Sequence, residues 1–162
     1  MTVDIVLPAL AAIEDDIQIG TAPDVITAFA FDDPPNSISG SLPCFINIFG
    51  ASTVDMGIAG EDEKGIDVID TCAYTATLYV APAGSGIPGE ASKKISPWIT
   101  PTMKMFLKHP SIAVGTDIIL LKYLGHERAR EGDLVYGGQQ YYGVEFRLQV
   151  LTRVRAIYAD NE

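Results

Sequence analysis

The clearest alternation of hydrophobic and polar residues lies near the C-terminal end, in the stretch "YGGQQYYGVEFRLQV" at residues 136–150. Its apolar side chains recur at every second position. One face carries Tyr142, Val144, Phe146, Leu148 and Val150, and the other carries Glu145, Arg147 and Gln149. A period of two predicts a β-strand with one buried face. The paired glycines at residues 137 and 138 separate this strand from a shorter strand-like run.

Three other segments have the composition of strands. In "LPCFINIFG", residues 42–50, only Asn47 is polar between Phe45 and Phe49, which predicts a strand that is covered on both faces. Residues 71–82, "TCAYTATLYVAP", alternate between two faces, and a further strand is expected at about residues 118–124. The alternation of the last strand continues past Val150, so we expect one long strand or two consecutive ones there.

Two segments have a helical period. Residues 5–17 place isoleucine and leucine on one side, and the helix is expected to end close to Gly20. The second helix is expected from residue 96 to His109, with Ser96 as its N-cap and Pro110 after its end. Its inward stripe consists of Trp98, Thr102, Met105 and Phe106. Between the first helix and the first strand, residues 23–31 form a short segment that is expected to be either helical or extended.

Two segments are interpreted as loops. Residues 32–41, "DDPPNSISGS", combine paired prolines with turn-forming residues. Residues 51–70 are acidic and interrupted by glycines, which predicts a long inter-strand loop with a functional or interaction role. The resulting fold class is α+β, with a mostly antiparallel β-sheet and helices packed on one face. We expect a single domain over residues 1–162, with an N-terminal helical arm (about 1–30) and the acidic loop (about 51–70).

The net charge of −10 is distributed unevenly along the chain. Residues 1–92 contain 14 acidic residues and one lysine, whereas residues 93–162 contain ten basic and seven acidic residues. The acidic half argues against general binding to nucleic acids, because phosphates would be repelled. The asymmetry is consistent with simple solubility or with complementary faces in a repeated assembly.

Motifs of enzyme chemistry are missing from the sequence. It has no G-x-S-x-G turn, no phosphate-binding loop with its lysine and no H-E-x-x-H pair. Cys44 and Cys72 are expected to be buried thiols, and no local ligand spacing joins them to His109 and His126 in a zinc site. We therefore expect no enzymatic activity, no cofactor and no metal. No apolar run is long enough to span a bilayer, and the N-terminus does not resemble a signal peptide.

Arginines on the last strand are the remaining surface feature. Arg147, Arg153 and Arg155 lie on the face opposite its apolar residues. They could protect an exposed strand edge, pair with acidic residues of a neighbouring subunit, or contact nucleic acid. The sequence alone leaves these three readings open.

The segments "LPCFINIFG", "CAYTATLYVAPAG" and "LVYGGQQYYGVEFRLQV", with a proline-opened helix ending near His109, resemble the tail terminator and neck proteins of long-tailed bacteriophages. The last strand, Tyr141 to Val150, carries the resemblance most closely. The resemblance implies a virion component, assembled in the host cytoplasm, that caps the tail tube as a ring of six subunits and joins it to the head. Its partners would be the tail tube protein and neck or head–tail connector proteins, and DNA would pass the lumen without specific binding.

The resemblance implies contacts between subunits in place of a catalytic site. The expected contact residues are Arg147, Arg153, Arg155, Glu61, Asp62, Glu63, Tyr141 and Tyr142. Two related alternatives are a neck or head-completion protein and a minor tail protein. Alternatives of a different class are a regulatory or adaptor protein and a small-molecule-binding α+β domain, which would use the space between Trp98 and the sheet.

Overall fold

The computed structural model describes residues 2–15, 17–61, 63–84, 89–115, 117–130 and 132–158, with side chains described at all of these except residues 2–4, 55–61 and 154–157. This part of the chain forms two helices and nine strands. The helices are α1 (Thr2–Glu14) and α2 (Glu90–Lys108). The strands are β1 (Gln18–Ile19), β2 (Ile26–Thr27), β3 (Phe29–Phe31), β4 (Cys44–Glu61), β5 (Gly65–Pro82), β6 (Ser111–Val114), β7 (Asp117–Arg128), β8 (Leu134–Tyr136) and β9 (Gln139–Ile157).

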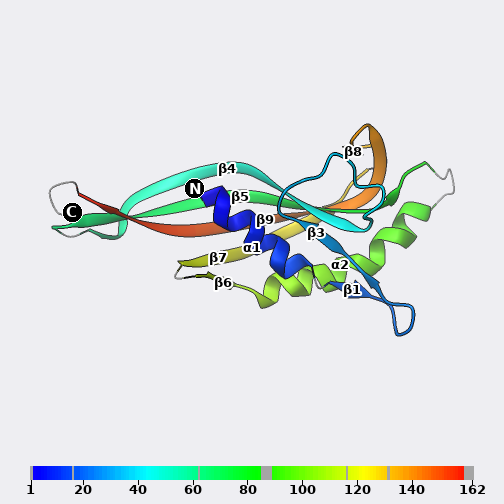
Figure 1. The fold of residues 1–162 in the computed structure, drawn as a ribbon, viewed down its shortest axis with the longest axis horizontal. Coiled ribbons are helices and arrows are strands. Elements are labelled where there is room, and N and C mark those ends of the chain that lie inside the picture. The colour runs from blue at the N-terminus through cyan, green and yellow to red at the C-terminus, as the bar shows by residue number, and fades with distance from the viewer. Residues whose placement is uncertain are drawn as a thin grey trace.

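Seven of the strands form one twisted sheet in the order β3-β4-β5-β9-β7-β6, and β8 also pairs with β9. Every pairing in it is antiparallel except that of β3 with β4. The strands β1 and β2 form a separate two-stranded hairpin. Both helices lie on the same side of the main sheet (Figure 1). The fold is therefore α+β with helices on one face, as the sequence predicted.

The longest feature is the hairpin formed by β4 and β5, and it corrects the interpretation of residues 51–70 as a loop. The two strands remain paired from Cys44 with Tyr79 to Met56 with Val68, and again at Glu61 with Ile66. This segment is rich in β-branched residues, which favour extended backbone. Gly50 falls at an irregularity in the register, so this glycine marks a β-bulge within a continuous strand.

The second half of the sheet is built on β9, as its alternation predicted. It is a single strand that pairs with β5 on one side and with β7 and β8 on the other. Tyr136 pairs with Gln139 across Gly137 and Gly138, which have φ angles of 58° and 82°. Two successive positive φ angles are those of a tight hairpin turn, and glycine adopts them without strain.

Two hydrophobic clusters lie on opposite faces of the sheet. The larger one is covered by the helices and contains Trp98 and Phe106 of α2 together with the alternate apolar residues of β5 and β9. The smaller one lies under the loop before β4 and the β8 hairpin, and it consists of Ile38, Cys44, Ile46, Tyr79, Leu134 and Tyr141. The face opposite the helices is thus covered at one end of the sheet only.

The helix boundaries differ from the sequence prediction. The first helix ends at Glu14, several residues before Gly20, and the chain then enters β1. The second helix begins at Glu90. Pro97 and Pro101 therefore lie inside it and do not mark its first turn. The hydroxyl of Ser96, which was expected to cap the helix, accepts a hydrogen bond from Arg128. The segment of residues 23–31 is extended, and the buried stripe of Trp98, Thr102 and Phe106 is confirmed.

Candidate functional site

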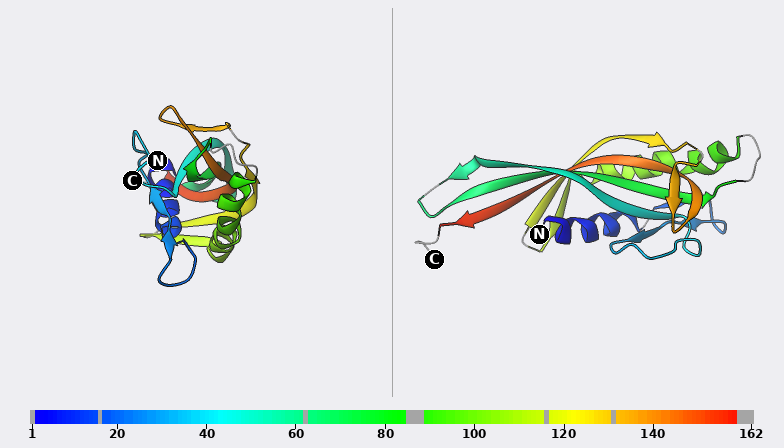
Figure 2. Two further views of the ribbon diagram at one scale, coloured as in Figure 1. Left: turned by 90° about the vertical axis from the view of Figure 1, so that its right-hand side faces the viewer. Right: turned by 90° about the horizontal axis from the view of Figure 1, so that it is seen from above.

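The strands β4, β5 and β9 continue beyond the rest of the sheet. The pairing of β7 with β9 ends at Leu120 with Leu151, whereas β5 stays paired with β9 as far as Gly65 with Ile157. We call the three-stranded part beyond this point the extension: residues 51–61 of β4, 65–71 of β5 and 152–157 of β9. At about 3.3 Å per residue it reaches roughly 20 Å past the last contact with β7. It forms the narrow end of the molecule in both long views (Figures 1 and 2).

Both outer edges of the extension lack a paired strand within the described residues. On one side β3 pairs only with Cys44–Ile46 of β4, so the outer edge of β4 is uncovered by strands from residue 47 onward. On the other side β7 leaves β9 at Leu151. An uncovered strand edge presents a row of backbone N–H and C=O groups that can pair with another chain. The extension therefore carries two candidate edges for association.

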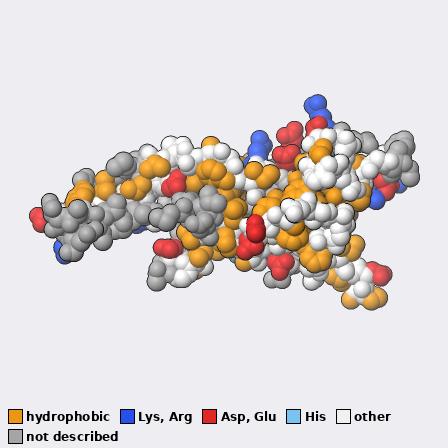
Figure 3. Space-filling model, turned by 45° about the horizontal axis from the view of Figure 1, so that its top comes forward, with side chains coloured by type: hydrophobic (Ala, Val, Ile, Leu, Met, Phe, Trp, Pro, Cys, Tyr) orange, Lys and Arg blue, Asp and Glu red, His pale blue; other side chains and the backbone are white. Residues whose placement is uncertain are grey.

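The face of the sheet opposite the helices is open where the smaller cluster ends. Register and alternation place Thr71, Ala73, Thr75, Lys122, Leu120, Arg147, Gln149 and Leu151 on this open face. Ile118, Leu120 and Ile48 are at least half exposed, at 61%, 50% and 51%. Hydrophobic side chains reach the surface between charged ones along the length of the molecule (Figure 3). A mixed apolar and charged surface of this kind is typical of association between subunits.

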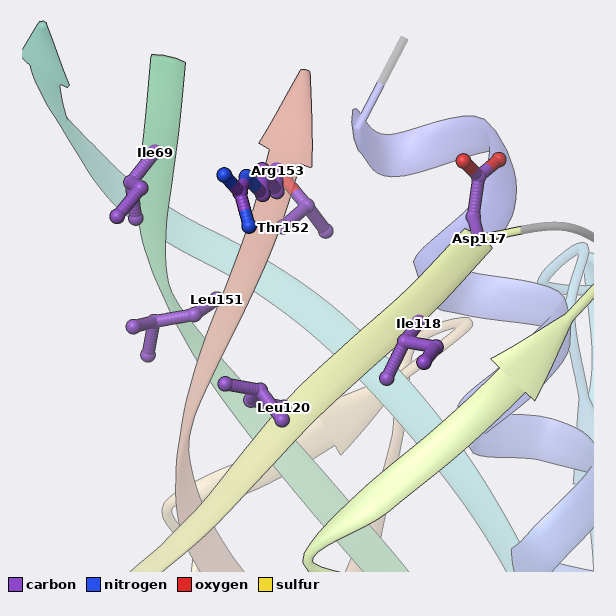
Figure 4. A pocket seen from close by; sticks show the side chains of 7 residues that line it. All are labelled: Ile69, Asp117, Ile118, Leu120, Leu151, Thr152 and Arg153. Carbon is purple, nitrogen blue, oxygen red and sulfur yellow. The ribbon is translucent and has the colours of Figure 1, made fainter. Parts of the chain in front are cut away.

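A groove of about 430 Å³ lies where β7 and β9 separate. Its apolar lining comes from three strands: Ile69 of β5, Leu151 of β9, and Ile118 and Leu120 of β7. Figure 4 shows these side chains around the fork, with Asp117 and Arg153 on its two arms. The groove thus joins the open face to the free edge of β9.

The three arginines predicted as contact residues lie on β9 in different settings. Arg147 is exposed on the open face, and its guanidinium lies across β7 at Gly125, where the absence of a side chain leaves room for it. Arg153 forms an ion pair with Asp67 of its own chain, across the β5–β9 pairing. Arg155 lies opposite Asp67 in the register, and its side chain is outside the described residues. Of the two arginines whose side chains are described, Arg147 is the one on the open face of the body, and Arg153 already serves an intrachain contact.

Two of the acidic residues predicted as contacts, Glu61 and Glu63, lie at the tip of the extension. Glu61 is the last residue of β4, and its side chain is not among those described. Asp62 lies outside the described residues, and Glu63 is exposed in the turn before β5. Glu61 pairs with Ile66, which is opposite Ala156, nine residues along β9 from Arg147, so Glu61 and Arg147 do not meet within one chain.

The structure corrects the prediction for Tyr141 and Tyr142. Their exposed fractions are only 1% and 4%, and the two side chains belong to the two different hydrophobic clusters. The ring of Tyr141 also packs edge-on against that of Tyr79. Both tyrosines therefore stabilise the fold of the subunit, and neither is available at its surface. Consecutive residues of a strand point to opposite faces, and here both faces are covered.

The two cysteines and the two histidines do not lie together at one site. Cys44 belongs to the smaller cluster and Cys72 to the larger one, so the two thiols lie on opposite faces of the sheet. Burial raises the pKa of Cys44 to about 12, and burial together with the carboxylate of Asp70 raises the pKa of Cys72 to about 11. His109 caps the end of α2, and His126 is hydrogen-bonded to the hydroxyl of Tyr123. Among the residues with described side chains, no group of three or more metal-ligating residues occurs.

A buried carboxyl group ties α1 to the sheet within the body, where Asn47 of β4 pairs with Ala76 of β5. Glu14 has an exposed fraction of 0% and accepts a hydrogen bond of 2.6 Å from the side-chain amide of Asn47 on β4. Burial raises its pKa to about 8, against the smaller opposing effect of this hydrogen bond. No local pattern in the sequence indicates this contact, because the two residues are 33 positions apart in the chain.

The space beside Trp98, considered for a small molecule, is filled. Trp98 has an exposed fraction of 2% and packs in the larger cluster, and it lines none of the four grooves found on the described surface. No helix in the described part of the chain has the length and apolarity to cross a membrane. Comparison of the sequence with protein-family models gave no match, and comparison with curated proteins gave none either.

Proposed function

We propose that this chain is a structural virion component that acts by self-association, forming a tail terminator-like ring where a bacteriophage tail meets its neck. The extension supports this proposal most directly. A three-stranded projection with two unpaired edges is a liability in an isolated molecule, since it can pair with other chains. In an assembly the same edges and the adjacent open face become contact surfaces.

A ring of this kind needs heterologous contacts, in which one surface of each copy meets a different surface of the next. The chain offers such a pair: the free edge of β4 on one side of the sheet and the fork between β7 and β9 on the other. Because these two surfaces lie at opposite edges of one sheet, copies can join side by side and close. Arg147 on the intervening face is placed to contact acidic residues of a neighbour.

The charge distribution is consistent with a channel for DNA. Residues 51–70, which include most of the extension, contain six acidic residues and one lysine. A negative surface repels phosphates, so DNA would pass without being held. The partners in this proposal are the tail tube protein on one side and neck or connector proteins on the other.

The test is the mass of the purified chain in solution, measured by light scattering over a concentration series and with added tail tubes. A ring of six copies of a 17.4 kDa chain has a mass of about 104 kDa, and electron micrographs should show annular particles, alone or at tube ends. A particle of 17.4 kDa at every concentration, with no binding to tubes, would overturn the proposal. Binding at the head-proximal vertex without tubes would favour a neck or head-completion role.

A further inference from the structure

A second groove, also of about 430 Å³, runs between the two helices. Its floor is apolar. It is formed by Ile13 of α1, by Ile17 just after α1, and by Pro101 and Met105 of α2. Lys104 and Lys108 line its α2 side and are exposed to solvent. We call it the helix groove.

Two exposed lysines line the helix groove of a chain that is acidic overall. The α2 helix contains four lysines and one acidic residue, whereas the whole chain has a net charge of −10. Lys94 is paired with Glu90 one turn earlier, but neither Lys104 nor Lys108 forms an ion pair with any side chain described by the structure. Two unpaired ammonium groups above an apolar floor favour an occupant that is both acidic and partly apolar.

The tip of the extension has this composition. Residues 61–67 contain four acidic residues and one lysine, and one of the four, Asp67, is already paired with Arg153 of its own chain. Beside them lies Tyr158, whose backbone N–H donates to the carbonyl of Lys64 and whose side chain is 39% exposed. The tip therefore combines negative charge with an accessible aromatic ring, and aromatic residues are enriched at the centres of protein interfaces.

We infer that the acidic tip of one copy docks in the helix groove of a second copy. A chain cannot fill its own groove, because the groove is lined by residues of α2, and Figure 1 shows that α2 lies away from the end of the molecule that the extension forms. The contact joins two different surfaces, so it is heterologous and can propagate around a ring or between stacked rings. This inference rests on the proposed self-association and assigns a partner surface to the extension.

A charge-swap experiment tests the inference. The groove variant carries Lys104→Glu and Lys108→Glu, the tip variant carries Glu61→Lys and Glu63→Lys, and a third chain carries all four changes. Lys93→Glu is the matched control, since Lys93 lies on the same helix, is exposed and does not line the groove. Circular dichroism and thermal unfolding establish that each variant is folded, and sedimentation velocity measures its association.

We expect the groove variant and the tip variant each to associate roughly ten-fold more weakly than the unmodified chain, the control to stay within about two-fold, and the four-change chain to recover most of the loss. Unchanged association of the folded groove variant would overturn the inference and leave the ring itself standing. Weakening without recovery in the four-change chain would show that the tip is not the occupant. If the unmodified chain never associates, the inference and the proposed function both fail.

Discussion

The same strands behave differently in the two halves of this molecule. In the body, Cys72–Val80 of β5 lies under the helices on one face and under the smaller cluster on part of the other, and most of its side chains are buried. In the extension, residues 66–71 of the same strand are all partly exposed. The backbone pairing is continuous through both. Strand formation here therefore depends on local sequence and pairing, whereas burial depends on whether a helix or loop covers the strand.

This difference indicates separate roles for the two regions. The body has its own hydrophobic core and accounts for most of the stability of the subunit. The extension has pairing but little cover, so its uncovered edges and faces are suited to contacts with other chains. Changes in the body should lower the stability of the subunit, and changes in the extension should act mainly on assembly.

The largest expected effect comes from a matched pair of substitutions in β9. Leu148→Ala removes a side chain that is 1% exposed in the larger cluster, and we expect the free energy of unfolding to fall by about 3 kcal/mol. Leu151→Ala, three residues along the strand on the open face, should cost about 1 kcal/mol, because that side chain is only partly buried. Urea unfolding of both variants measures the difference. Equal costs would contradict the difference in burial between the two faces of β9.

The next effect concerns Glu14, which is buried between α1 and β4 in the body. Its pKa of about 8 in the folded chain exceeds the ordinary 4.5, so the folded state holds a proton that the unfolded state releases. This group therefore lowers the free energy of unfolding as pH rises from about 4.5 to about 8, by about 1.4 kcal/mol per unit. Glu14→Gln should remove that slope and make the chain more stable at pH 7 by roughly 3 kcal/mol.

The measurement is urea unfolding of both proteins at several pH values between 5 and 9, at constant ionic strength. Asp15→Asn serves as the control, since Asp15 is the exposed neighbour of Glu14. It should leave the pH dependence unchanged. If the free energy of unfolding of the Glu14→Gln variant and of the unmodified chain changes with pH in the same way, the raised pKa of Glu14 is contradicted.

A smaller effect is expected for the open face. Arg147→Glu should weaken association roughly ten-fold and leave the melting temperature nearly unchanged, because the side chain is exposed and contacts little of its own core. Lys122→Glu, on the neighbouring strand of the same face, tests whether the effect is specific to the arginine. Unchanged association with normal melting would remove this face from the interface and leave the edges as the contact surface.

The smallest effect belongs to the ion pair between Arg153 and Asp67 in the extension. The side chain of Arg153 is 60% exposed and that of Asp67 is 13% exposed. Water and salt reach the guanidinium and screen the pair, so its contribution should be small. A double-mutant cycle with Arg153→Ala and Asp67→Ala should give a coupling below about 1 kcal/mol in the dissociated chain. A larger coupling would mean that the extension contributes to subunit stability more than its exposure indicates.

The sequence predicted the body better than the extension, for physical reasons. The alternation of β9 and the apolar stripe of α2 are strong periodic signals, and both elements were found, although α2 begins at Glu90, six residues earlier than expected. Residues 51–70 were interpreted as a loop, because glycine and acidic residues mask the period of two. A bulge at Gly50 also shifts the phase of that period within β4. The hydrophobic pattern of a single sequence does not reveal a strand that is stabilised mainly by backbone hydrogen bonds to its neighbouring strands.

The candidate contacts show the same limit. Alternation correctly placed Arg147 on the exposed face, but it could not show that Tyr141 is covered by the β8 hairpin or that Arg153 pairs with Asp67. Both contacts depend on the tertiary structure: the first on which segments cover that face of the sheet, and the second on the register between β5 and β9. The helix groove, formed by two distant helices, likewise left no local signal in the sequence.

Hydrogen exchange of the extension, followed as the chain is concentrated, tests the account most directly. Within residues 47–56 of β4 and 152–157 of β9, we expect the alternate backbone amides that point to the outer edge to exchange quickly in the dilute chain, because that edge is uncovered and only the inward-pointing amides pair with β5. At concentrations where the mass rises to that of the ring, they should become protected, while the amides of the body change little. Unchanged exchange of both edges in an assembled particle would show that the subunits meet elsewhere, and would contradict the role given to the extension.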